Sequence, residues 1–153
     1  MEKGTLIKVG MADLKAASYP NILTTLGLGS CVGIALYDSC TKTIGLAHVM
    51  LPSSQQARNN SNLAKFADTA IAKLLKEMEN LGARRGNIVA KLAGGAQMFN
   101  FSETSDMLRI GTRNVIAAKE CLKELNIPIV AEDTGGNFGR TIELYSDGGI
   151  LLV

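Results

Sequence analysis

Residues 31–52 hold two apolar segments, CVGIALYD and IGLAHVMLP, separated by the short polar stretch SCTKT. The first segment alternates with a period of two, so that Val32, Ile34 and Leu36 share one face, as in a β-strand. The second segment is also strand-like and stops at Pro52. Two strands around a short turn predict an antiparallel β-hairpin. The hairpin argues against a purely parallel, doubly wound sheet.

Two other segments have the spacing of amphipathic helices. Between residues 63 and 81 apolar side chains recur at i, i+3, i+4 and i+7, and Gly82 stands where such a helix ends. A second helix is marked by apolar residues between Val115 and Leu125. It ends near Asn126, because Pro128 prevents its continuation.

The remaining chain alternates between extended segments and loops. Extended segments are predicted at residues 5–14, 21–29, 87–96 and 127–136, with a hairpin at 140–153 turned by Asp147-Gly148-Gly149. Residues 53–62 form a polar loop, and residues 99–112 are irregular. We therefore predict an α/β fold, namely a layered sandwich with a mixed β-sheet, in a single domain covering residues 1–153.

Composition excludes several classes of function. The net charge is only +2 and no long block of Lys and Arg occurs, so the charge pattern indicates neither nucleic-acid binding nor adsorption to a membrane surface. No apolar run reaches the ~18 residues of a membrane span, so no membrane insertion is expected. No signal-peptide core is seen near the N-terminus, and we expect a cytoplasmic protein.

The cysteines are expected to be free thiols. Their count is three, which is odd, and no export signal accompanies them. The chain has one histidine and no C-x-x-C pair, which argues against a Cys/His metal site. Any imidazole base in this chain must therefore be His48.

Cys31 stands where a glycine-rich loop becomes a strand, directly after Gly29-Ser30. If the hairpin pairs Tyr37 with Ile44, residue 33 lies opposite His48, and Cys31 shares that face. The two side chains are then diagonal neighbours, ~7–8 Å apart between α-carbons. A slip of one residue would place them on opposite faces.

A thiol beside an imidazole can act as a nucleophile. The imidazole would stabilise the thiolate and take up its proton, while N–H groups of the glycine-rich loop would bind an oxyanion. A third group usually orients the imidazole, and the candidates are Thr25, Thr24, Asp38, Asp133 and Asn137. The alternative is a purely structural role, in which Cys31 fills core space and His48 is a buried, hydrogen-bonded histidine. On the residues alone, a Cys-His acyl-transfer enzyme and a non-catalytic binding module both remain open.

Five blocks in order carry a resemblance to a known family: TLGLGSCVGIALYD, GLAHVMLP, KLAGGAQMF, IGTRN and AEDTGGNFGR. In this order and spacing the chain closely resembles CheD, the chemoreceptor glutamine deamidase family of bacterial and archaeal chemotaxis. The match runs from about residue 22 to residue 140. What it implies is a layered α/β/α sandwich and a cysteine-dependent amidohydrolase that converts chemoreceptor glutamines to glutamate.

The resemblance also implies roles for single residues. Cys31 would be the nucleophile, His48 the base and Thr25 the third member, with Gly29 and Ser30 in the oxyanion loop. Glycine pairs are more often turns, yet Gly94, Gly95 and Asn137 are candidates for lining the substrate site. No metal or organic cofactor is implied.

The implied partners are the cytoplasmic domains of chemoreceptors, as substrate, and a CheC-type phosphatase. A runner-up function is an adaptor that binds both of these partners and has only weak or vestigial deamidase activity. A thiol protease is a third possibility, and release of ammonia without backbone cleavage would exclude it.

Overall fold

The computed structural model describes residues 4–55, 59–97 and 109–153. These residues contain nine strands and two α-helices, with short 3-10 turns at Leu63–Lys65 and Arg85–Asn87. The strands are β1 (Leu6–Lys8), β2 (Leu14–Ser18), β3 (Ile22–Leu28), β4 (Val32–Asp38), β5 (Thr43–Val49), β6 (Ile88–Gly94), β7 (Ile129–Thr134), β8 (Arg140–Tyr145) and β9 (Leu151–Leu152). The helices are α1 (Ala67–Asn80) and α2 (Ile110–Glu124).

The strands form two sheets, both mixed. The five-stranded sheet has the order β2-β5-β4-β6-β7, and only its β6–β7 pair is parallel. The four-stranded sheet has the order β1-β3-β8-β9, and there the β1–β3 pair is parallel. The predicted hairpins at 31–52 and 140–153 are both confirmed as antiparallel pairs.

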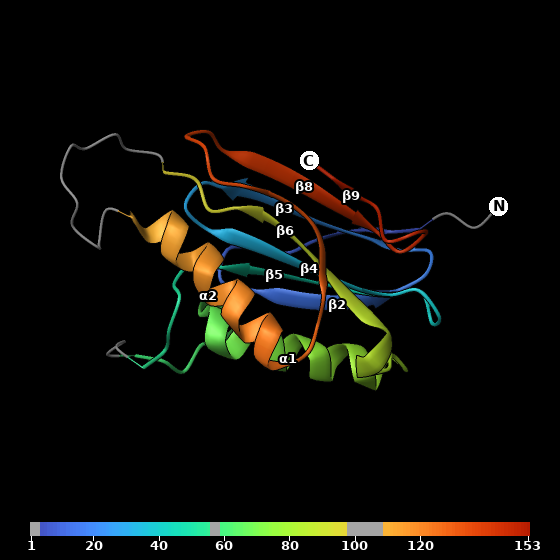
Figure 1. Cartoon of the computed structure of the whole chain (residues 1–153). Helices are drawn as coiled ribbons and strands as arrows, with labels where there is room; N and C mark the ends of the chain where they lie inside the picture. The colour runs from blue at the N-terminus through green and yellow to red at the C-terminus, as the bar shows by residue number, and fades with distance from the viewer. Residues whose placement is uncertain (1–3, 56–58, 98–108) are drawn as a thin grey trace.

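The molecule has three layers (Figure 1). Helices α1 and α2 cover one face of the five-stranded sheet, and the four-stranded sheet covers the other face. The α/β class with mixed sheets is thus confirmed, and the layer opposite the two helices is a sheet. The physical reason is that β3 pairs with β8 from the far end of the chain, so that β1 and β9 join a second sheet at its edges instead of extending the central one.

The two helices end as their sequences predict. After α1, Gly82 adopts a positive φ of 102°, and its N–H bonds to the carbonyl of Glu79 at 2.9 Å. After α2, Asn126 adopts a positive φ of 58°. The start of α2 differs from the sequence prediction, because the helix already begins at Ile110 within the stretch taken as irregular. Residues 99–108 of that stretch, and 56–58 of the polar loop, lie outside the described residues.

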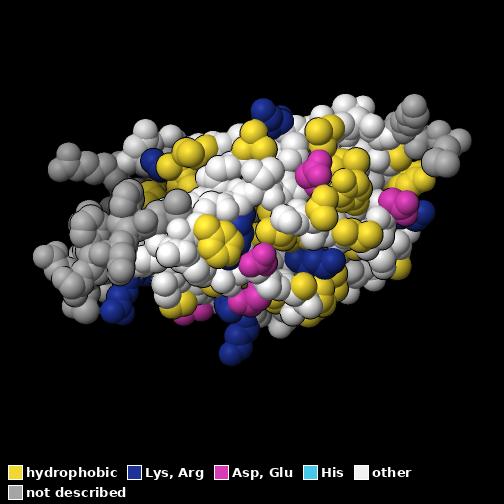
Figure 2. All heavy atoms as spheres, turned by 90° about the horizontal axis from the view of Figure 1, so that it is seen from above, with side chains coloured by type: hydrophobic (Ala, Val, Ile, Leu, Met, Phe, Trp, Pro, Cys, Tyr) yellow, Lys and Arg dark blue, Asp and Glu magenta, His cyan; other side chains and the backbone are white. Residues whose placement is uncertain are grey.

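Neither α1 nor α2 is long and apolar enough to cross a lipid bilayer, and they are the only α-helices in the part of the chain that the structure describes. The outward side of the four-stranded sheet carries apolar side chains between charged ones (Figure 2). Exposed apolar residues occur on three of its strands, namely Leu6, Leu26 and Leu152.

The close approach of α1 to β5 depends on Gly45. A β-carbon built at Gly45 would lie 2.7 Å from Met78 Sδ and 2.8 Å from Leu74 Cδ1. These are shorter than any ordinary contact between side chains, so a methyl group requires the helix side chains to move.

We therefore expect Gly45→Ala to lower the free energy of unfolding by about 1–3 kcal/mol, the usual effect of overpacking a core. Urea denaturation followed by circular dichroism measures this. Gly86→Ala is the matched control, because a β-carbon there meets nothing within 4 Å. Equal stability of the two variants would contradict this account of the helix–sheet contact.

Candidate active site

The register of the β4–β5 hairpin places Cys31 and His48 on one face. Tyr37 pairs with Ile44 and Gly33 pairs with His48, which is the register on which the shared face of Cys31 and His48 depends. Cys31 immediately precedes β4 and packs in the apolar cluster between the two sheets. Opposed residues of an antiparallel pair project from the same face, so His48 points into this layer as well.

The imidazole of His48 is held by the hydroxyl of Thr25, which β3 supplies from the other sheet. Both side chains are fully buried, and Thr25 Oγ1 lies 2.7 Å from His48 Nδ1. The same hydroxyl donates its proton to the carbonyl of Val9 at 2.7 Å. A hydroxyl has one proton, so Nδ1 must be the donor to Oγ1. This leaves the lone pair of the neutral imidazole on Nε2.

His48 Nε2 is buried and has no hydrogen-bond partner among the described residues. Burial lowers the pKa of the His48 imidazole, because the charged form loses its hydration. The resting imidazole is therefore neutral at physiological pH, and its free nitrogen can accept a proton.

The thiol of Cys31 is also nearly buried, with 8% of the residue exposed. Burial raises the pKa of the Cys31 thiol, and a hydrogen bond from its own backbone N–H partly offsets this. A thiolate stabilised in the resting site, as the sequence suggested, is thus not what the geometry favours. A neutral thiol faces the same layer as a neutral imidazole.

The other candidates for the third group make contacts elsewhere. Thr24 donates to the carbonyl of Ile142 at 2.8 Å. Asp38 accepts the backbone N–H groups of Cys40, Thr41 and Arg84 at the far end of the hairpin. Asp133 pairs with Arg140, and Asn137 is exposed in the β7–β8 loop. Thr25 is the candidate that the structure brings to His48.

Gly94 and Gly95 lie against the backbone of Cys31. The N–H of Gly95 donates to the Cys31 carbonyl at 2.8 Å, and the N–H of Ala96 donates to the Gly29 carbonyl at 2.8 Å. Gly94 has a φ of 102°, and a β-carbon there would lie 2.3 Å from the Cys31 carbonyl oxygen. Only glycine permits this approach. The loop at Gly29 and Ser30 is half-buried beside this contact.

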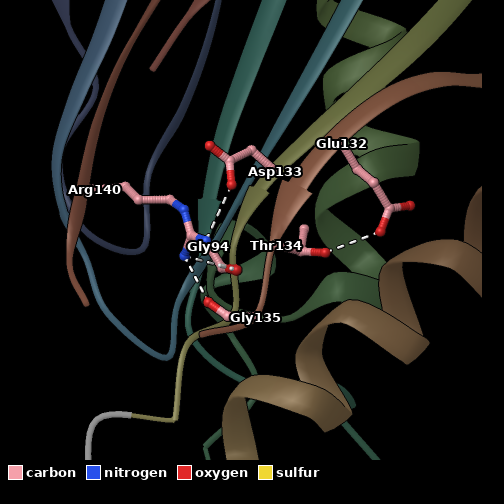
Figure 3. A network of polar contacts seen from close by, with 6 residues as sticks. All are labelled: Gly94, Glu132, Asp133, Thr134, Gly135 and Arg140. Atoms are coloured by element: carbon pink, nitrogen blue, oxygen red, sulfur yellow. Dashed lines mark hydrogen bonds and ion pairs between the residues drawn. The ribbon is translucent and has the colours of Figure 1, made fainter. Parts of the chain in front are cut away.

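Arg140, which was not among the predicted site residues, has a buried guanidinium that connects the β7–β8 loop to Gly94 (Figure 3). Arg140 donates to the carbonyl of Gly135 at 2.9 Å, to that of Gly94 at 3.5 Å and to Asp133 Oδ1 at 3.1 Å. Its side chain is only 3% exposed, and its guanidinium carbon lies 4.3 Å from the ring centre of Phe138. The signal in the sequence was the position of an arginine directly after a glycine-rich turn at a strand start.

These observations define a class of protein, namely a mixed α/β protein with a buried cysteine on the same sheet face as a histidine that a hydroxyl group holds. The chain belongs to the CheD family. The model of that family, described as CheD chemotactic sensory transduction, matches residues 50–153.

Relatives match nearly the whole chain. A protein of Caldanaerobacter subterraneus subsp. tengcongensis named probable chemoreceptor glutamine deamidase CheD is 60% identical over 148 residues, 97% of this chain and 91% of that one. A protein of Lachnoclostridium phytofermentans with the same name is 57% identical, over 98% and 93% of the two chains. The chemoreceptor glutamine deamidase CheD of Halalkalibacterium halodurans is 55% identical over 139 residues, 90% of this chain and 86% of that one.

The raised pKa of the Cys31 thiol has a measurable consequence. We expect the rate of Cys31 alkylation by iodoacetamide to rise at a higher pH in the folded protein than in the same chain unfolded in urea, because burial disfavours the thiolate. Mass spectrometry of the Cys31 peptide over a pH series measures both profiles. A folded profile shifted toward lower pH would overturn the assignment of a neutral resting thiol.

Proposed function

We propose that this chain is a chemoreceptor glutamine deamidase, which hydrolyses selected receptor glutamine side chains to glutamate and releases ammonia. The names of its relatives support the substrate and the reaction. The observation that carries the chemistry is the 2.7 Å contact between Thr25 Oγ1 and His48 Nδ1, which leaves the basic nitrogen on the face that Cys31 shares.

The first half of the reaction forms a thioester. The Cys31 sulfur attacks the amide carbon as its proton passes to His48 Nε2, and the carbonyl oxygen takes the negative charge. The C–N bond then breaks, and the Nε2 proton leaves with the amine as ammonia. Because the resting thiol and imidazole are both neutral, proton transfer accompanies attack.

The second half consumes water. His48 Nε2 accepts a proton from water as the oxygen attacks the thioester carbon. The C–S bond then breaks, and the sulfur recovers its proton from the imidazolium. The product is the glutamate carboxyl group, and the sum is glutamine plus water giving glutamate plus ammonia.

The oxyanion would be bound by backbone N–H groups of the Gly29–Cys31 loop. The own N–H of Cys31 already acts on its sulfur, since it counters part of the effect of burial on the thiol pKa. On the other side of the Cys31 α-carbon, the N–H of Gly95 donates to the Cys31 carbonyl, and this bond restrains the backbone of Cys31. Donors fixed before reaction stabilise the tetrahedral intermediate without reorganisation.

Because its partner is the hydroxyl of Thr25, the His48 imidazole is a weaker base than one held by a carboxylate. A carboxylate would stabilise the imidazolium by charge, whereas the hydroxyl offers only its lone pair, with the Val9 carbonyl behind it. We infer a slow modifying enzyme that needs no cofactor and works in the cytoplasm on receptor cytoplasmic domains. Asn137 remains a candidate for lining the substrate site.

The alternative is an adaptor between chemoreceptors and a CheC-type phosphatase, with weak deamidase activity. The observation that favours it is the set of exposed apolar side chains on the outer sheet, which include Leu26 and Leu152 (Figure 2). In that case a Cys31→Ala variant would keep its binding and its cellular effect.

The deciding experiment incubates a chemoreceptor cytoplasmic fragment with the wild-type protein or a variant. We expect wild type to convert particular glutamines, Cys31→Ala to convert none, and His48→Gln to be slower by about 10²–10⁴-fold. Peptide mass spectrometry and ammonia release measure conversion. Cys40→Ala is the control thiol, because Cys40 is exposed and lies at the far turn of the hairpin.

If the wild-type protein binds the receptor fragment but converts none of its glutamines, the adaptor function is supported instead. Cleavage of the fragment's backbone would instead indicate a thiol protease.

A further inference from the structure

The β4–β5 ladder includes His48, which pairs with Gly33, and stops just short of Cys31. Its last paired residues at this end are Val32 and Val49, which directly follow Cys31 and His48 in the chain. Beyond them the strand ends are joined by a side chain from another element. Asn114 of α2 donates through Nδ2 to the carbonyl of Ser30 and to that of Met50, both at 2.9 Å.

We propose that Asn114 is a positioning residue for the Cys31–His48 pair. Ser30 directly precedes Cys31, and Met50 follows His48 by two residues. One amide group therefore sets the spacing of the two strand ends where no ladder bond does so. This inference rests on the proposed function, because it assumes that the thiol and the imidazole act together.

The orientation of the Asn114 amide is fixed by its partners. Both are carbonyl oxygens, which only accept hydrogen bonds, so the NH₂ group must face them. The residue is fully buried, and its Oδ1 has no partner among the described residues. An apolar side chain would avoid that orphaned acceptor, so the gain from the amide lies in its two donors.

The start of α2 is itself held close to the site. A β-carbon at Gly111 would lie 2.3 Å from the Ala96 carbonyl oxygen, so the first turn of α2 touches the backbone of residues 95 and 96. Gly95 in turn donates to the Cys31 carbonyl. Asn114 therefore projects from a turn that is packed against the segment holding Cys31.

Loss of the bridge should separate the two groups without removing either. A shift of about 1 Å in a reacting pair can reduce a rate by ~10²-fold. We expect Asn114→Leu to lower kcat by a factor of this order and to leave KM unchanged, since both described hydrogen bonds of the Asn114 amide go to backbone carbonyls at the strand ends.

The test measures coupling between Cys31 and His48 without any receptor. Alkylation of Cys31 by iodoacetamide is followed by mass spectrometry in wild type, His48→Gln, Asn114→Leu and the double variant. We expect His48→Gln to slow alkylation by about ten-fold in wild type and by less than about two-fold in the Asn114→Leu background. Asn114→Ser, which can keep one of the two bonds, should give an intermediate value and serves if Asn114→Leu does not fold.

Ser146→Ala is the matched control. Ser146 is also fully buried and donates to one carbonyl, that of Asn21, at 2.6 Å. We expect it to lose stability in urea and to retain the full effect of His48→Gln.

An equal effect of His48→Gln with and without Asn114 would overturn the positioning role. No effect of His48→Gln in wild type would overturn it too, together with the Cys-His mechanism. Failure to convert receptor glutamines with the coupling intact would overturn the deamidase alone.

Discussion

The register of β4 against β5 decides whether this chain can hold a reactive pair at all. Gly33 opposite His48 puts the imidazole between the two sheets, and a slip of one residue would turn it toward the helices. Both strands are buried along almost their whole length, so a slip would also exchange their apolar faces. At the far end Asp38 accepts the backbone N–H groups of Cys40 and Thr41 in the turn and that of Arg84 after α1, which holds the register from that side.

The second sheet supplies the residue that holds the His48 imidazole. Thr25 belongs to β3, and its bond to His48 crosses from one sheet to the other. The space for this contact exists because Gly33 has no side chain: a β-carbon there would lie 2.7 Å from Ile142 Cδ1. The small residue opposite His48 therefore lets the sheets pack closely enough for a threonine hydroxyl to reach the ring.

Local pattern was enough to predict the hairpin and the C-terminal ends of both helices, because each depends on neighbours in the sequence, whereas the register of the hairpin entered only as a condition. The pairing of β3 with β8 joins residues more than a hundred positions apart, and no spacing in the chain reports it. For the same reason the residues alone left five candidates for the partner of His48. The contacts of Asn114 and Arg140 also depend on long-range packing. Both residues lie in motifs that the sequence shows, IGTRN and AEDTGGNFGR, but the motifs do not indicate which segments these side chains contact.

Buried polar atoms without partners gather in one region of the molecule. In the described residues they are His48 Nε2, Asn114 Oδ1 and Arg140 Nε. Each such atom opposes folding by about 1–3 kcal/mol, and native proteins hold few of them.

All three residues bond to segments that flank or contact Cys31: Asn114 to the Ser30 carbonyl, Arg140 to the Gly94 carbonyl, and His48 to Thr25. A chain selected only for stability would spread or remove these atoms. Their concentration around one thiol fits the proposed deamidase site, in which the Cys31 thiol gives its proton to the free imidazole nitrogen as the sulfur attacks a carboxamide.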